Sequence, residues 1–171
     1  IINAGTDVSV CDGSQATLTA TGGTAYTWAP AITNGTPFLP TIGAATYTVT
    51  GTDVNGCIAS DEVIVTVNQL PTVNAGNDVV TCAGVPITLT ASGAATYTWS
   101  PIITNNVPFT PSAGSTVYTV TGTSADGCTG TDQLTVTVNS NLLADFTPVA
   151  TLGCTPLTVT FTNNTANSVN C

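Results

Sequence analysis

Six cysteines are the residues of this sequence best suited to chemistry, and they fall two to each of three successive segments. An even number of cysteines in a Thr-rich, acidic chain points to disulfide bonds and an oxidising compartment. Paired within each segment, they are expected to form Cys11–Cys57, Cys82–Cys128 and Cys154–Cys171. The alternative is that they are buried free thiols. Zinc binding is a poor rival, because the sequence has no CxxC motif and no histidine.

The expected Cys11–Cys57 bond would staple one end of a small domain, since Cys11 ends a predicted strand and Cys57 follows a predicted turn. Closing this loop of 46 residues should stabilise the domain by about 4 kcal/mol in the chain-entropy model. That is a large contribution for a domain of this size.

The sequence gives little support for acid–base or nucleophilic catalysis. Without His and Lys, the usual bases of a catalytic triad are missing, and a Lys–Asn isopeptide bond is ruled out. Asp61 and Glu62 are adjacent, but neighbours on a strand point to opposite faces. We therefore interpret them as a solvated strand start and predict that the chain is not an enzyme.

Calcium is a minority hypothesis for the remaining oxygen ligands, because it prefers carboxylate and carbonyl oxygens. The candidate ligands are Asp7, Asp53, Asn55 and Asp78. Since Asx residues in turns usually serve the turn itself, no cofactor is expected.

Aromatic side chains offer a sugar-stacking platform as one interpretation and core packing as the other. Tyr26 and Trp28 share one face of a predicted strand, and both recur as Tyr97 and Trp99. Core packing is favoured, because a ligand platform would be free to differ between copies. The expected core aromatic residues are Trp28, Trp99, Tyr47 and Tyr118.

Charge excludes several classes of partner. The chain has no Lys, Arg or His, and nine acidic residues give a formal charge of −9. Nucleic-acid binding is excluded, because phosphate neutralisation needs basic side chains. Attachment to a membrane surface through a polybasic patch is excluded for the same reason.

An internal repeat positions all of these residues. Ala45–Asn68 returns as Thr116–Asn139, and equivalent cysteines and tryptophans are separated by 71 positions. In both copies, two alternating runs rich in Val, Thr and Tyr flank Asn55-Gly56 or Asp126-Gly127. Such dipeptides supply the positive φ angles of a tight hairpin turn.

Period-two patterns predict which faces are buried. A first edge strand is expected over Ile2–Val10, and Ala16, Leu18 and Ala20 should point inward from the next. In the last strand, Ile64 becomes Thr135, whereas the residues at 63, 65 and 67 stay apolar as Leu134, Val136 and Val138. The second set should face the core. Six or seven short strands without helical periodicity indicate a β-sandwich.

The predicted organisation is therefore all-β, with tandem Ig-like β-sandwich domains stapled by disulfides. Repeat 1 is expected at residues 1–69 and repeat 2 at 70–140. A third, different β domain is expected to start at 141 and to be cut off at 171, so the chain reads as a segment of a longer protein. No apolar run is long enough for a transmembrane helix.

Both repeats share the pattern NAGxD…C…TLTAxG…YTWxP…YTVTGTxxxGC…D…VTVN, at Asn3–Asn68 and Asn74–Asn139. This pattern resembles the Ig-like repeats of very large Bacteroidetes surface proteins, including gliding-motility adhesins exported by the type IX secretion system. The segment from Ala144 to Asn163 looks like the start of a PKD domain, whose WxFGDG motif would lie beyond Cys171. Antibody-type domains place the second Cys two residues after a strand Tyr, whereas here Tyr47 precedes Cys57 by ten positions.

The resemblance implies a secreted, extracellular segment of a cell-surface adhesin, acting as a non-enzymatic stalk or fibre. Its partners would be neighbouring repeats of the same chain, with surface glycans or other cells as further partners. The alternative is a carbohydrate-binding accessory module of a secreted enzyme. A homo-polymeric filament is a third hypothesis, because an exposed edge strand can accept a neighbour's strand.

Overall fold

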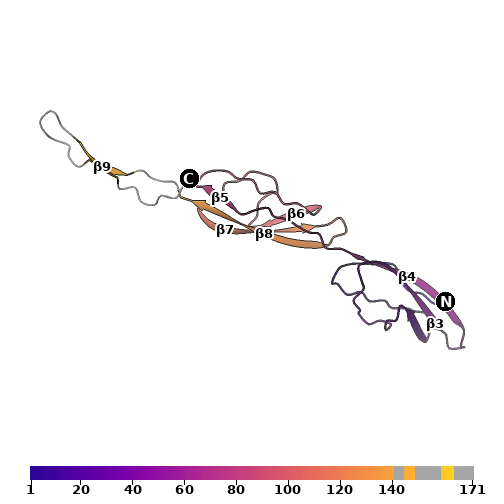
Figure 1. The fold of residues 1–171 in the computed structure, drawn as a ribbon. Helices are drawn as coiled ribbons and strands as arrows, with labels where there is room; N and C mark the ends of the chain where they lie inside the picture. Colours follow the sequence, from indigo (N-terminus) through magenta and orange to yellow (C-terminus); the bar gives the residue numbers. More distant parts are fainter. Residues whose placement is uncertain (141–144, 149–158, 164–171) are drawn as a thin grey trace. The chain divides into compact units, whose positions relative to one another are not determined.

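The structure is a computed structural model that describes residues 1–140, 145–148 and 159–163. Within these residues, all regular secondary structure is β-strand. The chain divides into two compact units (Figure 1). Unit 1 is Ile1–Thr72 together with Ala94–Thr96 and Gly122–Gly130, and the rest of the chain forms unit 2. In the described part of the chain, no helix could span a membrane.

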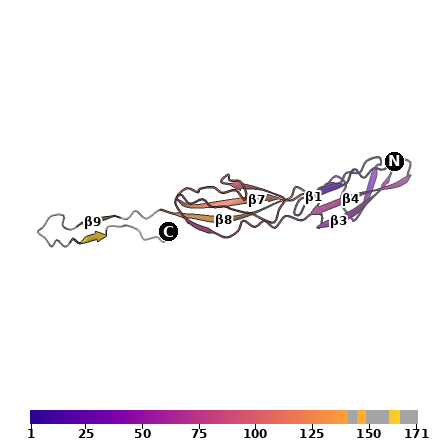
Figure 2. The same ribbon diagram turned by 90° about the horizontal axis from the view of Figure 1, so that it is seen from above.

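The first repeat is built on one four-stranded sheet. Its strands are β1 (Val8–Cys11), β2 (Ala25–Ala29), β3 (Gly43–Thr52) and β4 (Ile58–Asn68). They lie in the order β1-β4-β3-β2. The long strands β3 and β4 form an antiparallel hairpin, and β2 pairs antiparallel to β3. At the other edge, β1 runs parallel to β4 (Figure 2).

The second layer of the sandwich consists of extended segments held by isolated bridges. Asn3 bridges Thr21, and Ala16 bridges Phe38. Residues 16–20 form no regular strand, yet Ala16, Leu18 and Ala20 are buried and the residues between them are exposed, as predicted. The predicted six or seven strands are therefore four strands and two bridges in each repeat.

The second repeat has the same topology. Its strands are β5 (Val79–Cys82), β6 (Thr96–Ser100), β7 (Gly114–Thr123) and β8 (Thr129–Asn139), in the order β5-β8-β7-β6 with β5 parallel to β8. Beyond it, β9 (Phe146–Pro148) and β10 (Phe161–Asn163) form an antiparallel pair. Most of the expected PKD-like domain lies outside the described residues.

The predicted first strand over Ile2–Val10 is wrong in detail. The chain leaves the Thr21 bridge after Asn3, turns at Gly5 and joins β4 only at Val8. Gly5 has a φ of +92°, a left-handed conformation that glycine adopts without the steric cost of a Cβ. The first segment therefore serves both layers of the sandwich.

The hairpin turn also differs from the predicted two-residue type. Asp53 N donates to the Cys57 carbonyl at 3.0 Å, so Val54, Asn55 and Gly56 form a three-residue loop. Only Gly56 has a positive φ, +81°. A type I turn followed by a left-handed glycine is the common solution for a loop of this length.

Between the layers lies the apolar core predicted from the alternating pattern. In the first repeat, Val63, Val65 and Val67 are at most 2% exposed, whereas Ile64 is 42% exposed. Leu134, Val136 and Val138 are buried in the second repeat. Two layers around an apolar core, an antiparallel β2-β3-β4 sheet and a first strand added parallel to β4 define tandem Ig-like β-sandwiches, linked by a disulfide.

Candidate functional site

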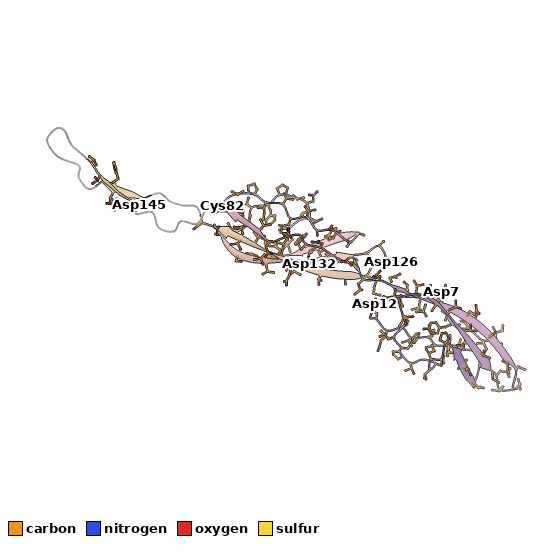
Figure 3. The ribbon with its side chains drawn as sticks, in the orientation of Figure 1. Asp7, Asp12, Cys82, Asp126, Asp132 and Asp145 are labelled. Carbon is orange, nitrogen blue, oxygen red and sulfur yellow. A yellow bond between two sulfur atoms is a disulfide. The ribbon has the colours of Figure 1, made fainter. Side chains whose placement is uncertain are left out.

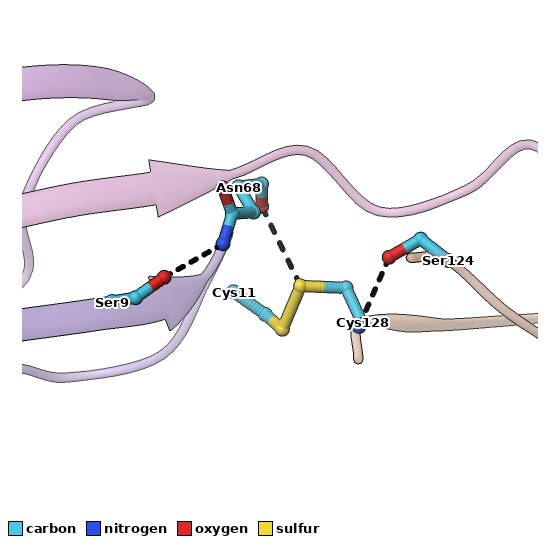
Figure 4. Close-up of a disulfide and its surroundings, with 5 residues drawn as sticks. All are labelled: Ser9, Cys11, Asn68, Ser124 and Cys128. Carbon is cyan, nitrogen blue, oxygen red and sulfur yellow. Dashed lines mark hydrogen bonds between the residues drawn. A yellow bond between two sulfur atoms is a disulfide. The ribbon is translucent and has the colours of Figure 1, made fainter. Parts of the chain in front are cut away.

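The main covalent feature of the described residues is a disulfide that joins the two sequence repeats. Cys11, the last residue of β1, is bonded to Cys128, which follows the β7–β8 turn 117 positions later (Figure 4). Their Cα atoms lie 5.6 Å apart, in the usual range for a disulfide. Both residues belong to unit 1, because residues 122–130 are part of that unit.

The expected pairs Cys11–Cys57 and Cys82–Cys128 are therefore wrong. Because β1 runs parallel to β4, Cys11 lies in register with Asn68 at the C-terminal end of β4. Cys57 immediately precedes the other end of that strand, at Ile58. Ten residue steps of strand correspond to about 33 Å, and a disulfide requires Cα atoms within about 7 Å. The two cysteines of one repeat cannot reach each other.

The end of the first repeat forms the seat for Cys128. Its side chain is only 1% exposed, and its Sγ lies 3.9 Å from the Asn68 carbonyl oxygen. A disulfide sulfur carries no proton, so this is a packing contact. The Asn68 side chain is held in turn by Ser9, whose Oγ accepts a hydrogen bond from Asn68 Nδ2 at 2.9 Å (Figure 4).

A preformed turn presents Cys128 to this seat. Ser124 Oγ accepts a hydrogen bond from Cys128 N at 3.1 Å, and Ser124 N donates to the Cys128 carbonyl at 2.8 Å. Gly127 N donates to the Ser124 carbonyl at 3.1 Å. These bonds fix the cysteine at the tip of the hairpin without using its side chain.

The remaining cysteines are in different states. Cys57 is a free, exposed thiol. Cys82, the last residue of β5 (Figure 3), is disulfide-bonded, but its partner is not Cys128. The expected Cys154–Cys171 pair lies outside the described residues.

Asp61 has a structural task that the sequence interpretation missed. Its Oδ2 accepts a hydrogen bond from Ala4 N at 2.8 Å, and in the second repeat Asp132 accepts one from Ala75 N at the same distance. These backbone N–H donors lower the pKa of both carboxyl groups. The residue therefore ties the first segment to the last strand instead of being merely solvated.

The weak calcium candidates are also backbone acceptors. Asp7 Oδ1 accepts from Ile64 N at 2.9 Å, and Asp78 Oδ1 accepts from Thr135 N at 2.7 Å. Asp7 and Asp12 flank β1 at its two ends (Figure 3). Among the described residues, no three His, Cys, Asp or Glu side chains gather as a metal site would require.

Asp53 and Asn55 belong to the first hairpin turn. Asp53 Oδ1 accepts hydrogen bonds from Asn55 N at 2.8 Å and from Cys57 N at 2.9 Å. The carboxylate therefore holds the loop, as Asx residues in turns generally do.

All four expected core aromatic residues are buried: Trp28, Trp99, Tyr47 and Tyr118 are 4% to 7% exposed. Each tryptophan is fixed by an asparagine six positions later. Trp28 Nε1 donates to Asn34 Oδ1 at 3.1 Å, and Trp99 Nε1 donates to Asn105 Oδ1 at 3.2 Å. Because Trp28 is 4% and Trp99 is 5% exposed, neither presents an open ring face on which a sugar could stack.

The same asparagine oxygen also accepts a backbone hydrogen bond across the sandwich. Asn34 Oδ1 accepts from Ala20 N and Asn105 Oδ1 accepts from Ala91 N, at 2.7 and 2.8 Å. The sequence interpretation missed these two residues. Their signal was present in the repeat, because an asparagine stands at the same position in both copies.

A surface depression of about 540 Å³ lies beside this pair in the second repeat. It is lined in part by Tyr97, Trp99 and Ile102. Ile102 is 96% exposed whereas Trp99 is 5% exposed, so the hollow offers an aliphatic rim and no open tryptophan face.

No protein-family model matches the chain, and no curated protein matches it. Solved structures with a similar arrangement include the fibronectin(III)-like modules of Clostridium thermocellum CbhA, with 14% identity, 82% of this chain and 95% of that chain covered, and a TM-score of 0.41. A segment of titin domains has 12% identity, covers 86% and 68%, and has a TM-score of 0.41. Immunoglobulin domains of Sidekick-1 have 15% identity, cover 88% and 40%, and have a TM-score of 0.41. None of these similarities carries information on function.

Proposed function

We propose that this chain is a non-enzymatic structural segment of a large extracellular surface protein, a stalk or fibre that supports adhesion. The observation that carries this proposal is the Cys11–Cys128 disulfide, which covalently links two successive copies of a repeat. Adding repeats of constant chemistry lengthens a tandem array without new binding functions.

The disulfide changes how the chain would transmit tension. A force applied at the two ends of the chain passes from Cys11 directly to Cys128, because the disulfide is a covalent shortcut. The residues between these cysteines, which are 117 positions apart in the sequence, are then shielded from the load. A surface stalk benefits from such a bond, since opening of the shielded residues between the two cysteines would not lengthen the stalk.

Two features of the chain support the extracellular location that this proposal requires. Disulfides persist in oxidising environments, and the chain offers no site to a protease that cuts after Lys or Arg. The resemblance of the repeat to Bacteroidetes surface adhesins makes a secreted, cell-surface protein the specific form of this proposal, with neighbouring repeats, glycans or other cells as its partners.

Single-molecule stretching tests the structural role. The oxidised chain carrying Cys82→Ala, which removes the separate disulfide of Cys82, is pulled from its two ends and compared with the same chain carrying Cys11→Ala and Cys128→Ala as well. At about 3.5 Å per residue, the variant should release roughly 400 Å more contour length. Cys57→Ala is the matched control and should stretch like the parent. Equal extension of the parent and the double variant would contradict the proposed load path.

Surface location needs a separate measurement. Antibodies against the chain should label intact, non-permeabilised cells of the source organism. Reductant should not release the label, because the two repeats are joined by the polypeptide backbone as well as by the disulfide. Labelling only after permeabilisation would contradict the proposed location and leave the stretching result unaffected.

A further inference from the structure

We propose that Cys57 is the attachment point for a preceding repeat, whose first-strand cysteine forms a disulfide with it. Each repeat would then be bonded to the next through the same pair of positions as Cys11–Cys128. This bond requires only a preceding repeat of the same type. It does not depend on the surface location or the adhesive role proposed above.

The repeat spacing sets the geometry of this bond. Cys57 and Cys128 occupy equivalent positions, 71 residues apart. A preceding copy of equal length would place its first-strand cysteine 117 residues before Cys57, the separation found between Cys11 and Cys128. The proposed bond therefore has the sequence separation of one that is observed.

The turn that carries Cys57 already has the conformation of the bonded turn. Asp53 Oδ1 accepts from Cys57 N at 2.9 Å, as Ser124 Oγ does from Cys128 N at 3.1 Å. Asp53 N donates a hydrogen bond to the Cys57 carbonyl at 3.0 Å, and Ser124 N donates the equivalent bond to the Cys128 carbonyl at 2.8 Å. The free turn is thus preorganised for a bond that is already made at the equivalent position.

The end of the sheet that carries the first-strand cysteine is built in the same way in both repeats. Cys11 is in register with Asn68, and Cys82 is in register with Asn139. The residue after each cysteine donates its backbone N–H to that asparagine carbonyl, at 2.8 and 2.9 Å. Cys82 is itself disulfide-bonded. The first-strand position is therefore oxidised in both copies.

The free cysteine Cys57 and the bonded cysteine Cys128 differ in solvent exposure. Cys128 is 1% exposed in its seat against the end of the first repeat, whereas Cys57 is exposed. A preceding repeat ending in the same Val-Asn sequence would supply the missing seat. An exposed thiol is also accessible to the oxidant that the reaction needs.

Bond formation requires a disulfide oxidant, for example oxidised glutathione or a protein disulfide of the secretory route. One thiolate attacks the oxidant and forms a mixed disulfide, and the second thiolate displaces the oxidant's remaining thiol. The two cysteines together lose two electrons and two protons, and the oxidant is reduced to two thiols.

The test uses the full chain preceded by one added copy of residues 1–71, which keeps the repeat spacing. Ser14→Ala in the added copy marks its cysteine peptide, since Ser14 is exposed. Both proteins are oxidised with glutathione, alkylated without reduction, cut with chymotrypsin and mapped by mass spectrometry. Alkylation of Cys57 should fall about tenfold or more in the extended chain, and a marked peptide bonded to the Cys57 peptide should appear.

Replacing the cysteine of the added copy by alanine is the matched control and should restore alkylation of Cys57. The Cys11–Cys128 peptide pair reports that the chain is folded. Persistent alkylation of Cys57 beside an intact Cys11–Cys128 pair would overturn the proposal. So would a bond between Cys57 and another cysteine in the unextended chain, a result that requires no folding of the added copy.

Discussion

Cys11 lies in register with Asn68, the last residue of β4, and Cys128 packs against the carbonyl of that same asparagine. Because β1 pairs parallel to β4, Cys11 lies at the C-terminal end of β4, where it bonds to Cys128 after the β7–β8 turn of the second repeat. The covalent link between repeats follows from this one pairing.

Thiol mapping should show the consequence directly. In the oxidised parent, alkylation without reduction should modify Cys57 and spare Cys11 and Cys128, because the last two are bonded to each other. In Cys11→Ala, the thiol of Cys128 should become available to alkylation after mild denaturation, while Cys57 remains unchanged. Protection of Cys128 in this variant would show a different pairing.

Removing the carboxamide of Asn34 should destabilise the first repeat. Asn34→Ala leaves the N–H groups of Trp28 and Ala20 without their acceptor, and a buried unsatisfied donor costs about 1–3 kcal/mol. Urea unfolding followed by tryptophan fluorescence measures the change. Thr33→Ala, at an exposed neighbouring position, is the control and should change stability by less than about 0.5 kcal/mol. Equal effects of the two changes would contradict the role of Asn34.

Adjacent residues of β4 should differ sharply in their effect on stability. Val65 is 0% exposed and Ile64 is 42% exposed. Val65→Ala should cost about 2 kcal/mol through lost burial and the cavity left behind, whereas Ile64→Ala should cost well below 1 kcal/mol. Thermal unfolding of the two variants under oxidising conditions makes the comparison. A larger effect at Ile64 would mean that the opposite face is buried.

Low pH should remove the contribution that the ionised Asp61 and Asp132 side chains make to the stability of the fold. Because the Ala4 and Ala75 N–H groups lower the pKa of these carboxyl groups, the ionised side chains stabilise the fold above their unfolded pKa, near 4. This contribution is lost as pH falls through the lower folded pKa. An Asp61→Asn, Asp132→Asn variant should melt below the parent at pH 7, and the difference should close toward pH 2. A difference that does not change with pH would contradict the assignment.

Calcium should leave the melting temperature unchanged. Asp7, Asp53 and Asp78 each accept backbone hydrogen bonds, and the described residues contain no three-ligand cluster. Thermal unfolding in millimolar calcium and in EGTA should therefore coincide. A rise of several degrees with calcium, absent in an Asp7→Asn, Asp78→Asn variant, would restore the calcium hypothesis.

Local pattern was sufficient for much of the fold. Alternation identified the buried faces of residues 16–20 and of β4, because a strand places successive side chains on opposite faces. The burial of Trp28 could be predicted because it recurs with its neighbours in the second copy. The turn was placed correctly, but its length was not, since a glycine after an asparagine fits both a two-residue and a three-residue loop.

The sequence by itself determined that this protein is all-β, that its core faces alternate and that its motif recurs every 71 residues. Tertiary structure alone decided which cysteines meet. Six cysteines allow many pairings, and the choice depends on whether β1 runs parallel or antiparallel to β4, a long-range pairing that leaves no local trace. The parallel direction places Cys11 about 33 Å of strand away from Cys57 and against Cys128.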